Sequence, residues 1–506
     1  MGVGRSGVLV LALATALMWP HVAADSPIPH PSTLHQHAVD FRLGEAAIQP
    51  GPHDPSGQAG SGGRAVAHSA GGIRVRAKRV TRRAPDARLY RTGVTTWEPT
   101  MGITQQGTIV VNAESDGSVP SVMSSRDGGK SWDVAFDGHP ITADPYLWVD
   151  PDTSRIFAND YVPPCHLISI SDDEGETWTT NRPTACGYNS DHQTIFGGPP
   201  PEGSMEPTEY QNVVYICSIG DGISIAAAGS VCSRSLDGGV TFTPTGTQPF
   251  VDDPTKTGDL GVPGLCSGSH GHGFVGPDGA VYLPRGWCGQ PYVAISHDEG
   301  LTWTRVQVAD LGMPCCGEVI GVDETLYSHE AGVVADALGN VYYAWVANDR
   351  LPYLAISRDG GTTWDEPMMI GPPGLKEALL PGITIGRAGR VAVHYMGSTN
   401  SPWNGTEMAS DPADMTWNAY ITMTVQALKD DPLFYSGTIN APAEPLRVGP
   451  CGPDPARCEW GDFFDVVVGV EGDPWAVAVD LCTDESCGGG LGEAIIGRLK
   501  GGPPLK

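Results

Sequence analysis

An eight-residue pattern that recurs five times constrains the fold of this chain more than any other feature. All five copies fit Ser-x-Asp-x-Gly-x-Ser/Thr-aromatic. They are Ser125–Trp132, Ser171–Trp178, Ser235–Phe242, Ser296–Trp303 and Ser357–Trp364. The gaps between successive Asp residues are 46, 64, 61 and 61 residues. Self-similarity at a nearly fixed long period predicts a repeat architecture.

The residues of the pattern are those of a tight hairpin turn. The Asp side chain accepts hydrogen bonds from the backbone amides that follow it, and the Gly supplies a positive φ. The Ser or Thr then enters the next strand, and the aromatic ring is buried where the hairpin packs on its neighbour. The five copies are therefore expected to serve the fold and not to bind a ligand.

The five copies resemble Asp-box repeats, also called BNR repeats, of sialidase-like β-propellers. The resemblance implies that each copy joins the two outer strands of a propeller blade. It also implies that the copies lie away from the face that binds substrate.

A second repeat lies upstream of these boxes, with an apolar strand, a Gly/Asp turn and another apolar strand. Its seven copies are residues 98–113, 144–160, 191–198 with 212–219, 270–286, 329–346, 380–395 and 462–480. Plainer strand pairs follow the last two copies, and an Asp box follows each of the others. Each copy is interpreted as the two inner strands of a blade. The chain is thus predicted to be all-β, a β-propeller of four-stranded blades. Seven blades are favoured, and six, as in sialidases, are the alternative.

Residues 1–24 are predicted to be a secretory signal peptide. Arg5 supplies the positive N-terminal region, Gly7–Met18 the apolar run, and Val22–Ala24 a small-residue cleavage site. The apolar run is short for a membrane span, and no later segment is long and apolar enough to be one. The protein is therefore expected to be secreted and extracellular.

Residues 25–91 are predicted to be a disordered leader, because they are rich in Pro and Gly and lack apolar periodicity. The leader ends in a basic segment, residues 73–91, in which residues 73–80 alternate between apolar and basic. Residues 73–80 either form an exposed strand that joins the last blade and closes the propeller, or the basic segment holds a processing site. Residues 92–506 are assigned to the propeller.

The twelve cysteines favour disulfides, which form in exported proteins. No two Cys-x-x-Cys motifs occur, so thiolate metal sites are disfavoured. Four pairs are predicted from their spacing: Cys165 with Cys186, Cys217 with Cys232, Cys451 with Cys458, and Cys482 with Cys487. The pairing of Cys266, Cys288, Cys315 and Cys316 is left open.

Charge is unevenly distributed along the chain. The formal net charge is −28, made up of +6 in residues 1–91 and −34 in the remainder. So acidic a body repels nucleic acid and anionic membranes. The expected partner is an extracellular glycan or glycoprotein, and a monomer is expected.

The starts of the predicted inner strands are the candidate binding residues, because these strands converge on the central channel of a propeller. Almost all of them are acidic or His, which is unusual for a structural position. The predicted funnel comprises Glu98, Asp144, Asp191, His192, His270, His272, His329, Glu330 and Asp462. No cofactor is required, but His270, His272 and Glu330 are a possible set of ligands for a divalent cation. The alternative is that these rings bond to backbone groups in the channel.

The resemblance implies a stricter catalytic set. Sialidases use three arginines for the substrate carboxylate, a Tyr nucleophile primed by Glu, and an Asp acid/base. The candidates here are Asp191, Glu330, Arg285, Arg350 and Tyr395. Leu89–Gly93 lacks the Pro of the Arg-Ile-Pro-like motif that normally carries the first arginine. Two hypotheses follow: a sialidase-like glycoside hydrolase acting on extracellular glycans, or a non-catalytic propeller that binds glycan or protein through its funnel.

Overall fold

The computed structural model describes most of one compact unit, His37–Lys506. The described residues are 40–44, 46–48, 86–114, 121–137, 143–186, 191–204, 210–219, 229–251, 270–312, 318–319, 322–323, 331–404, 412–449, 460, 463–482 and 492–506.

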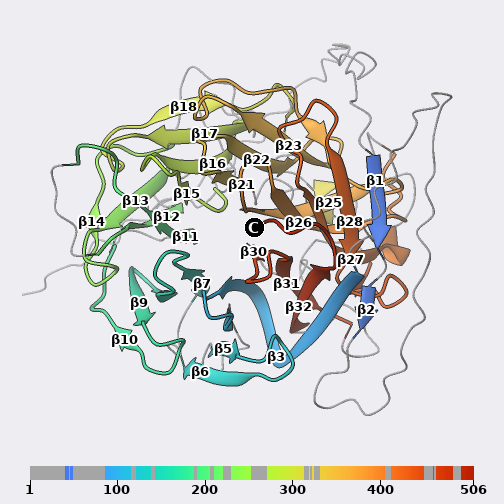
Figure 1. Cartoon of the computed structure of the whole chain (residues 1–506), viewed down its shortest axis with the longest axis horizontal. Helices are drawn as coiled ribbons and strands as arrows, with labels where there is room; N and C mark the ends of the chain where they lie inside the picture. The colour runs from blue at the N-terminus through green and yellow to red at the C-terminus, as the bar shows by residue number, and fades with distance from the viewer. Residues whose placement is uncertain are drawn as a thin grey trace, which may run out of the picture. The chain divides into compact units, whose positions relative to one another are not determined.

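The structure is a β-propeller of seven four-stranded antiparallel blades, as favoured from the sequence. In Figure 1 the blades form a ring, with β7, β11, β21 and β30 near its middle and β6, β10, β14 and β18 on its rim. Successive inner strands contact one another around the ring, and the contact between β30 and β3 completes it.

The strands of each blade are given from the inner to the outer one. Blade 1 has the second half of β3 (Asp86–Ile103), β4 (Ile109–Glu114), β5 (Ser121–Ser125) and β6 (Asp133–Asp137); blade 2 has β7 (Ala143–Val149), β8 (Ile156–Val162), β9 (Cys165–Ser171) and β10 (Thr179–Thr180); blade 3 has β11 (Asp191–Gly198), β12 (Val213–Ile219), β13 (Ser230–Ser235) and β14 (Thr243–Pro244). Blade 4 has β15 (Phe274–Val275), β16 (Val281–Trp287), β17 (Gln290–Ser296) and β18 (Thr304–Gln307); blade 5 has β21 (Gly332–Ala335), β22 (Val341–Val346), β23 (Pro352–Ser357) and β24 (Met368–Met369). Blade 6 has β25 (Glu377–Ile385), β26 (Val391–Ser398), β27 (Thr416–Thr424) and β28 (Leu433–Thr438); blade 7 has β30 (Val466–Val468), β31 (Pro474–Asp480), β32 (Gly492–Lys500) and the first half of β3. Outside the blades lie β1 (Asp40–Gly44), β2 (Ala46–Ile48), the pair β19 (Glu318–Val319) and β20 (Val322–Asp323), β29 (Arg447–Val448) and a 3-10 helix, η2 (Pro412–Asp414).

A single long strand closes the ring. β3 pairs with β32 from Asp86 to Thr96 and then with β4 from Trp97 to Ile103, so that it is the outer strand of blade 7 and the inner strand of blade 1. Residues 86–91 are therefore part of the outer strand of blade 7. The closing strand expected at residues 73–80 lies outside the described part.

Two short stretches of the expected leader, β1 and β2, are strands. β1 pairs in parallel with β28, and β2 pairs in parallel with the blade 7 half of β3. The outer strand of a blade presents unpaired backbone groups along its free edge, and such an edge readily accepts another strand. Composition alone did not indicate this pairing.

The Asp boxes make the predicted turns, each between the third and fourth strands of its blade. In the fourth box, Asp298 accepts bonds from the backbone N–H of Thr302 (2.8 Å), the Thr302 hydroxyl (2.6 Å) and the Ser296 hydroxyl (2.8 Å). Similar bonds recur in the other boxes. They favour the carboxylate and lower the pKa of all five Asp residues, that of Asp173 to about 2.

The residue after the box Asp has a positive φ, and its identity alternates. It is Gly128, Gly238 and Gly360 in three boxes. In the other two boxes it is Glu174 (φ 63°) and Glu299 (φ 57°), and non-Gly residues rarely adopt this conformation. Glu174 accepts a bond from the Thr104 hydroxyl in the neighbouring blade. Glu299 accepts one from Ser204 (2.7 Å) and pairs with Arg234. Bonds to the adjacent blade thus accompany the strained conformation.

The hydrophobic core lies between adjacent blades. Every residue of β22 is buried. Box aromatics reach these interfaces. Trp178 stacks on Phe136 of the preceding blade at 5.0 Å, and Trp364 packs against a core cluster that blades 4 and 5 share. No blade covers its own faces, so each depends on its neighbours.

Two of the four predicted disulfides are confirmed. Cys165 bonds to Cys186, and Cys217 bonds to Cys232 across β12 and β13. Cys288 and Cys482 are also disulfide-bonded. The remaining predictions involve Cys451, Cys458 and Cys487, which lie outside the described residues.

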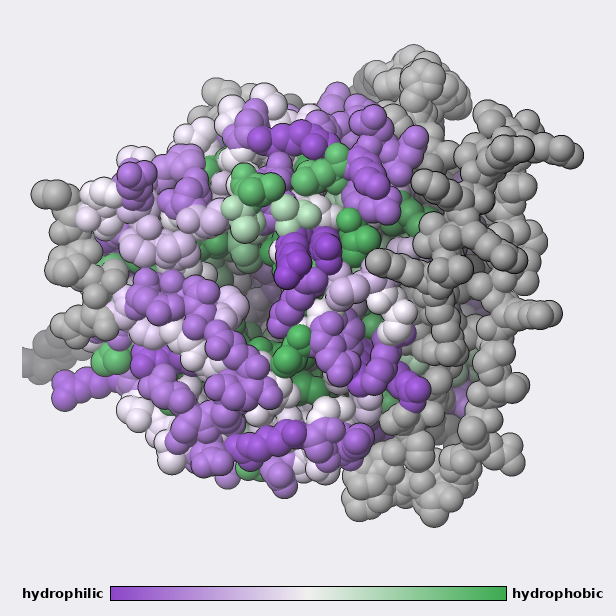
Figure 2. Space-filling model, in the orientation of Figure 1, coloured by the Kyte–Doolittle hydropathy of each residue, from purple (hydrophilic) through white to green (hydrophobic). Residues whose placement is uncertain are grey.

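The surface agrees with the composition. Figure 2 shows one face on which hydrophilic residues predominate, with small hydrophobic areas near the middle. Among the described residues, no helix has the length and hydropathy needed to cross a membrane.

Candidate functional site

The two ends of the propeller differ in what they carry. Strand directions alternate within a blade, so the inner strand starts at the same end as the turn between strands two and three. The Asp boxes lie at the other end. We call the first end the site face.

Four inner strands have a bulge near the site face. Register shifts separate Trp97 from Thr100 in blade 1, Ala143 from Tyr146 in blade 2, Asp191 from Thr194 in blade 3 and Leu379 from Gly382 in blade 6. In three of these bulges a residue adopts the left-handed conformation: Glu98 (φ 51°), His192 (φ 53°) and Leu380 (φ 53°). Bulges re-aim side chains and often adjoin functional sites, where backbone strain is retained.

The side chains of His272, Tyr146 and Asp465 come from three different blades and are in contact. The Tyr146 hydroxyl of blade 2 contacts Nδ1 of His272, which precedes β15 of blade 4. Asp465, just before β30 of blade 7, places Oδ1 3.1 Å from the same nitrogen. The backbone N–H of Met101 donates to Asp465 Oδ2 (3.0 Å) and fixes the carboxylate. His272 and Asp465 retain 12% and 15% side-chain exposure, so solvent reaches the group.

A second set of rings lies beside this group. His192 meets His270 edge-on at 6.2 Å and Phe463 at 4.9 Å between ring centroids. Ser230 Oγ lies 3.2 Å from His270 Nδ1 and accepts a bond from Arg285 (3.1 Å). Burial of His270, reinforced by the nearby His192 and Arg285, holds its pKa well below the usual value, so the ring is neutral.

We call Tyr146, His192, His270, His272, Phe463 and Asp465 the channel cluster. Phe463 joins its two parts, because its ring also meets Tyr146 edge-on at 5.2 Å. The cluster combines three imidazoles, a phenol and a carboxylate beside an apolar ring. Such a set can bind a polar ligand and exchange protons with it.

Arg350 lies elsewhere on the site face, in the turn between β22 and β23. Its Nη1 donates to Glu377 Oε1 (2.7 Å) at the start of β25, and both side chains are almost fully buried. Ser401 donates to the other oxygen of Glu377. Burial raises the pKa of Glu377, while the Ser401 hydroxyl and the adjacent guanidinium favour its ionised form. The Arg350 guanidinium also lies 3.8 Å from the centroid of the Trp403 ring.

Only part of the predicted funnel can be placed. His192, His270 and His272 lie in the channel cluster, and Glu98 begins the inner strand of blade 1. Asp144 and Asp191 lie in the inner strands β7 and β11, but the positions of their side chains are outside the described part. His329, Glu330 and Asp462 are outside it altogether.

Three of the catalytic candidates, Arg285, Arg350 and Tyr395, can be placed in the structure. Arg285 and Arg350 are each 1% exposed, lie in different blades and bond to protein groups. Tyr395 lies in the core of blade 6, where its ring stacks on Tyr420 and its hydroxyl bonds to Thr422. Within the described stretches, no group of three or more His, Cys, Asp or Glu side chains is arranged to hold a metal ion.

Sequence reasoning missed Tyr146, Asp465 and Phe463. Tyr146 lies two residues after Asp144 in the same inner strand. Asp465 is in the same repeat copy as Asp462. Extending each predicted start by three residues, with attention to aromatic residues, would have included all three.

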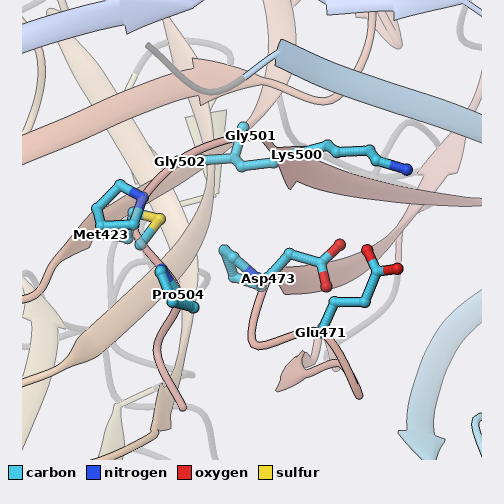
Figure 3. A pocket seen from close by; sticks show the side chains of 10 residues that line it. Met423, Glu471, Asp473, Lys500, Gly501, Gly502 and Pro504 are labelled. Carbon is cyan, nitrogen blue, oxygen red and sulfur yellow. The ribbon is translucent and has the colours of Figure 1, made fainter. Parts of the chain in front are cut away.

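A separate pocket of about 230 Å³ opens at the opposite end, between blades 6 and 7. Figure 3 shows the carboxylates of Glu471 and Asp473 side by side in it, with Met423 and Pro504 across from them. Arg498 donates to Asp473 (2.9 Å), so this acidic pair is already partly balanced. The pocket is remote from the channel cluster, where the chemically varied residues gather.

Comparisons with known proteins add the following. No family model matches the chain, and no curated protein matches it. Among solved structures, a Dyadobacter fermentans protein of unknown function is 14% identical with a TM-score of 0.42, over 83% of this chain and 98% of its own. A Trypanosoma rangeli sialidase is 12% identical with a TM-score of 0.36, over 80% of this chain and 54% of the sialidase chain. A Penicillium chrysogenum alpha-L-arabinanase is 12% identical with a TM-score of 0.37, over 60% of this chain and 90% of the arabinanase chain. Similarity this low transfers no activity.

Proposed function

We propose that this protein is an exported propeller that cleaves extracellular glycans at its site face, with Tyr146, His272 and Asp465 as the reactive group. The observation that carries the proposal is the meeting of these three side chains from blades 2, 4 and 7. A phenol, an imidazole and a carboxylate in contact can activate a nucleophile and hold the proton that it releases.

The geometry suggests the order of proton transfers. In this order the Tyr146 hydroxyl first gives its proton to Nδ1 of His272, and the phenolate that forms attacks the anomeric carbon and breaks its bond to the glycosidic oxygen. The proton now on Nδ1 faces the Asp465 carboxylate, which stabilises the imidazolium. His272 then gives this proton to the departing glycosidic oxygen. Water attacks the glycosyl-tyrosine, His272 accepts the proton of the water and returns it to Tyr146, and the cycle closes.

Most retaining glycosidases use a carboxylate as the nucleophile, whereas sialidases use a tyrosine. The Asp boxes of this chain resemble those of sialidases. We do not extend the proposal to sialic acid. Sialic acid recognition needs arginines free to bind a carboxylate, whereas Arg285 and Arg350 are buried and bonded to protein groups. The substrate class is therefore given as glycan.

Export is part of this proposal. Residues 1–24 have the features of a signal peptide, and every described cysteine is in a disulfide. Disulfides persist in oxidising, extracytoplasmic compartments.

A non-catalytic glycan-binding propeller is the second candidate. It is favoured by the burial of Tyr146, which is only 4% exposed, because a nucleophile must reach its substrate. Under this alternative the channel cluster serves only to hold a ligand.

The test compares glycan release with glycan binding. The secreted protein is incubated with a panel of polysaccharides and glycoproteins, released sugars are quantified, and binding is measured on a glycan array. We expect wild-type turnover, and a loss of at least about 100-fold in kcat for Tyr146→Phe and His272→Gln with binding retained.

Tyr282→Phe is the matched control, because this buried hydroxyl donates to Gly360 near an Asp box, away from the site face. It should leave kcat unchanged. Binding without any turnover by the wild type would establish the second candidate. Neither binding nor turnover would reject the glycan assignment.

A further inference from the structure

We infer that Trp403 is a stacking platform for a second sugar ring, placed on the site face beside the Arg350–Glu377 pair. This inference rests on the proposed function, since it assigns a subsite for the same glycan. It concerns recognition of the chain beyond the sugar that is cleaved.

The Trp403 ring is held from two directions. The Arg350 guanidinium covers one face, with its Cζ 3.8 Å from the ring centroid. The indole Nε1 donates to the backbone oxygen of Asp349 (3.2 Å). The backbone N–H of Trp403 donates to the Ser401 hydroxyl (3.1 Å), which in turn donates to Glu377. The ring is therefore fixed in orientation before any ligand arrives.

The support beneath the ring is unusually rigid. Arg350 has a left-handed backbone (φ 62°), and its carbonyl accepts the N–H of Ala378 (2.8 Å) at the start of the inner strand of blade 6. Its side chain is in the buried ion pair with Glu377 (2.7 Å). A strained residue kept in place by a buried pair is typical of a functional position.

Trp403 is nevertheless half-buried and not fully buried. Because Arg350 covers one face and Asp349 occupies the Nε1 edge, a ligand would approach the ring from the opposite face or the far edge. An aromatic face that is rigid and open beside a channel offers contact area at little entropic cost. The C–H face of a pyranose or furanose ring is the complementary surface.

The position fits a subsite and not the reaction centre. Trp403 lies in the loop after β26 of blade 6 and packs on the turn of blade 5, whereas Tyr146, His272 and Asp465 come from blades 2, 4 and 7. All of these residues belong to the site face. A glycan that reaches both places must run from the inner-strand starts outward over the loop of blade 6, so oligosaccharides are expected to bind better than single sugars.

The experiment compares substrates of different length on variants of the secreted protein. Trp403→Ala should raise KM for an oligosaccharide by about tenfold, the effect of losing one stacked ring. It should change kcat/KM for the corresponding nitrophenyl monosaccharide by less than about twofold. Trp403→Phe, which keeps an aromatic face, should restore most of the oligosaccharide affinity.

Trp364→Ala is the control, because this half-buried Trp lies in an Asp box at the other end. It should lower the melting temperature without a length-dependent change in KM. If Trp403→Ala has the same KM as the wild type for both the short and the long substrate, and turnover is intact, Trp403 is not a platform. The proposed function would still stand. Absence of binding and turnover in the wild type would reject both.

Discussion

Replacement of His394 is predicted to reduce the acid sensitivity of the fold. His394 lies in β26, fully buried, with Nδ1 2.7 Å from the carbonyl oxygen of Tyr420 and its ring 5.8 Å from that of Phe464. Burial lowers its pKa from 6.5 to about 4. The folded protein therefore keeps a neutral ring at pH values where the unfolded chain is already protonated.

The sign and size of the effect follow from this difference. The stability contributed by the neutral ring is fully present above pH 6.5 and is lost as the pH falls toward 4, because only the unfolded state gains the proton. A shift from 6.5 to about 4 corresponds to about 3 kcal/mol of unfolding free energy across that window. The slope for one proton is about 1.4 kcal/mol per pH unit.

The assay is urea unfolding, followed by fluorescence, between pH 7.5 and 4.5. His394→Gln cannot take up the proton, so its stability should fall less steeply than that of the wild type, by up to about 1.4 kcal/mol per pH unit. The control is His297→Gln, because His297 is exposed in an Asp box. A wild-type slope in His394→Gln would refute the assignment of a buried neutral ring.

Three further predictions concern the fold. Trp303→Ala should lower the unfolding free energy by about 3 kcal/mol without changing glycan affinity, and unchanged melting or a selective loss of binding would contradict a structural role for the box. Glu299→Ala should cost about 3 kcal/mol by removing the Glu299–Arg234 ion pair, while Glu299→Gly should recover about 1 kcal/mol by relieving the positive φ; equal melting temperatures for the two variants would show that strain is negligible there. Replacing both Cys217 and Cys232 by Ala should cost about 3 kcal/mol, as expected for a loop of about 15 residues, and a denaturation midpoint equal to that of the wild type would contradict it.

The fold was predictable because its signals are local and repeated. Each Asp box carries its own turn chemistry within eight residues, as the bonds to Asp298 illustrate. Seven copies of the inner-strand pattern then indicated seven blades. Similarly, Cys217 and Cys232 flank one hairpin, so their pairing needed no long-range information.

The site was only partly predictable, because it depends on contacts between distant blades. His192, His270 and His272 were found from their place at inner-strand starts. The partners of His272 come from residues 146 and 465, which are brought together only when β3 closes the ring. No local pattern reports such a meeting.

Arginine is the residue type for which sequence position was least informative. Arg285 and Arg350 both follow inner strands, as required of substrate ligands. Ser230 and Glu377, from neighbouring blades, satisfy them inside the protein. Whether a cation faces solvent or a buried partner depends on the side chain that the next blade supplies.

The central claim is that Tyr146 attacks the glycan with His272 as its base, and trapping the covalent intermediate tests it most directly. The wild-type protein is incubated with a panel of 2-deoxy-2-fluoro glycosyl fluorides, denatured in acid, digested and analysed by tandem mass spectrometry. The account predicts a glycosyl adduct on Tyr146 that is absent from Tyr146→Phe and forms at least about 100-fold more slowly in His272→Gln. An adduct on another residue, or the same rate of labelling in His272→Gln as in the wild type, would contradict it.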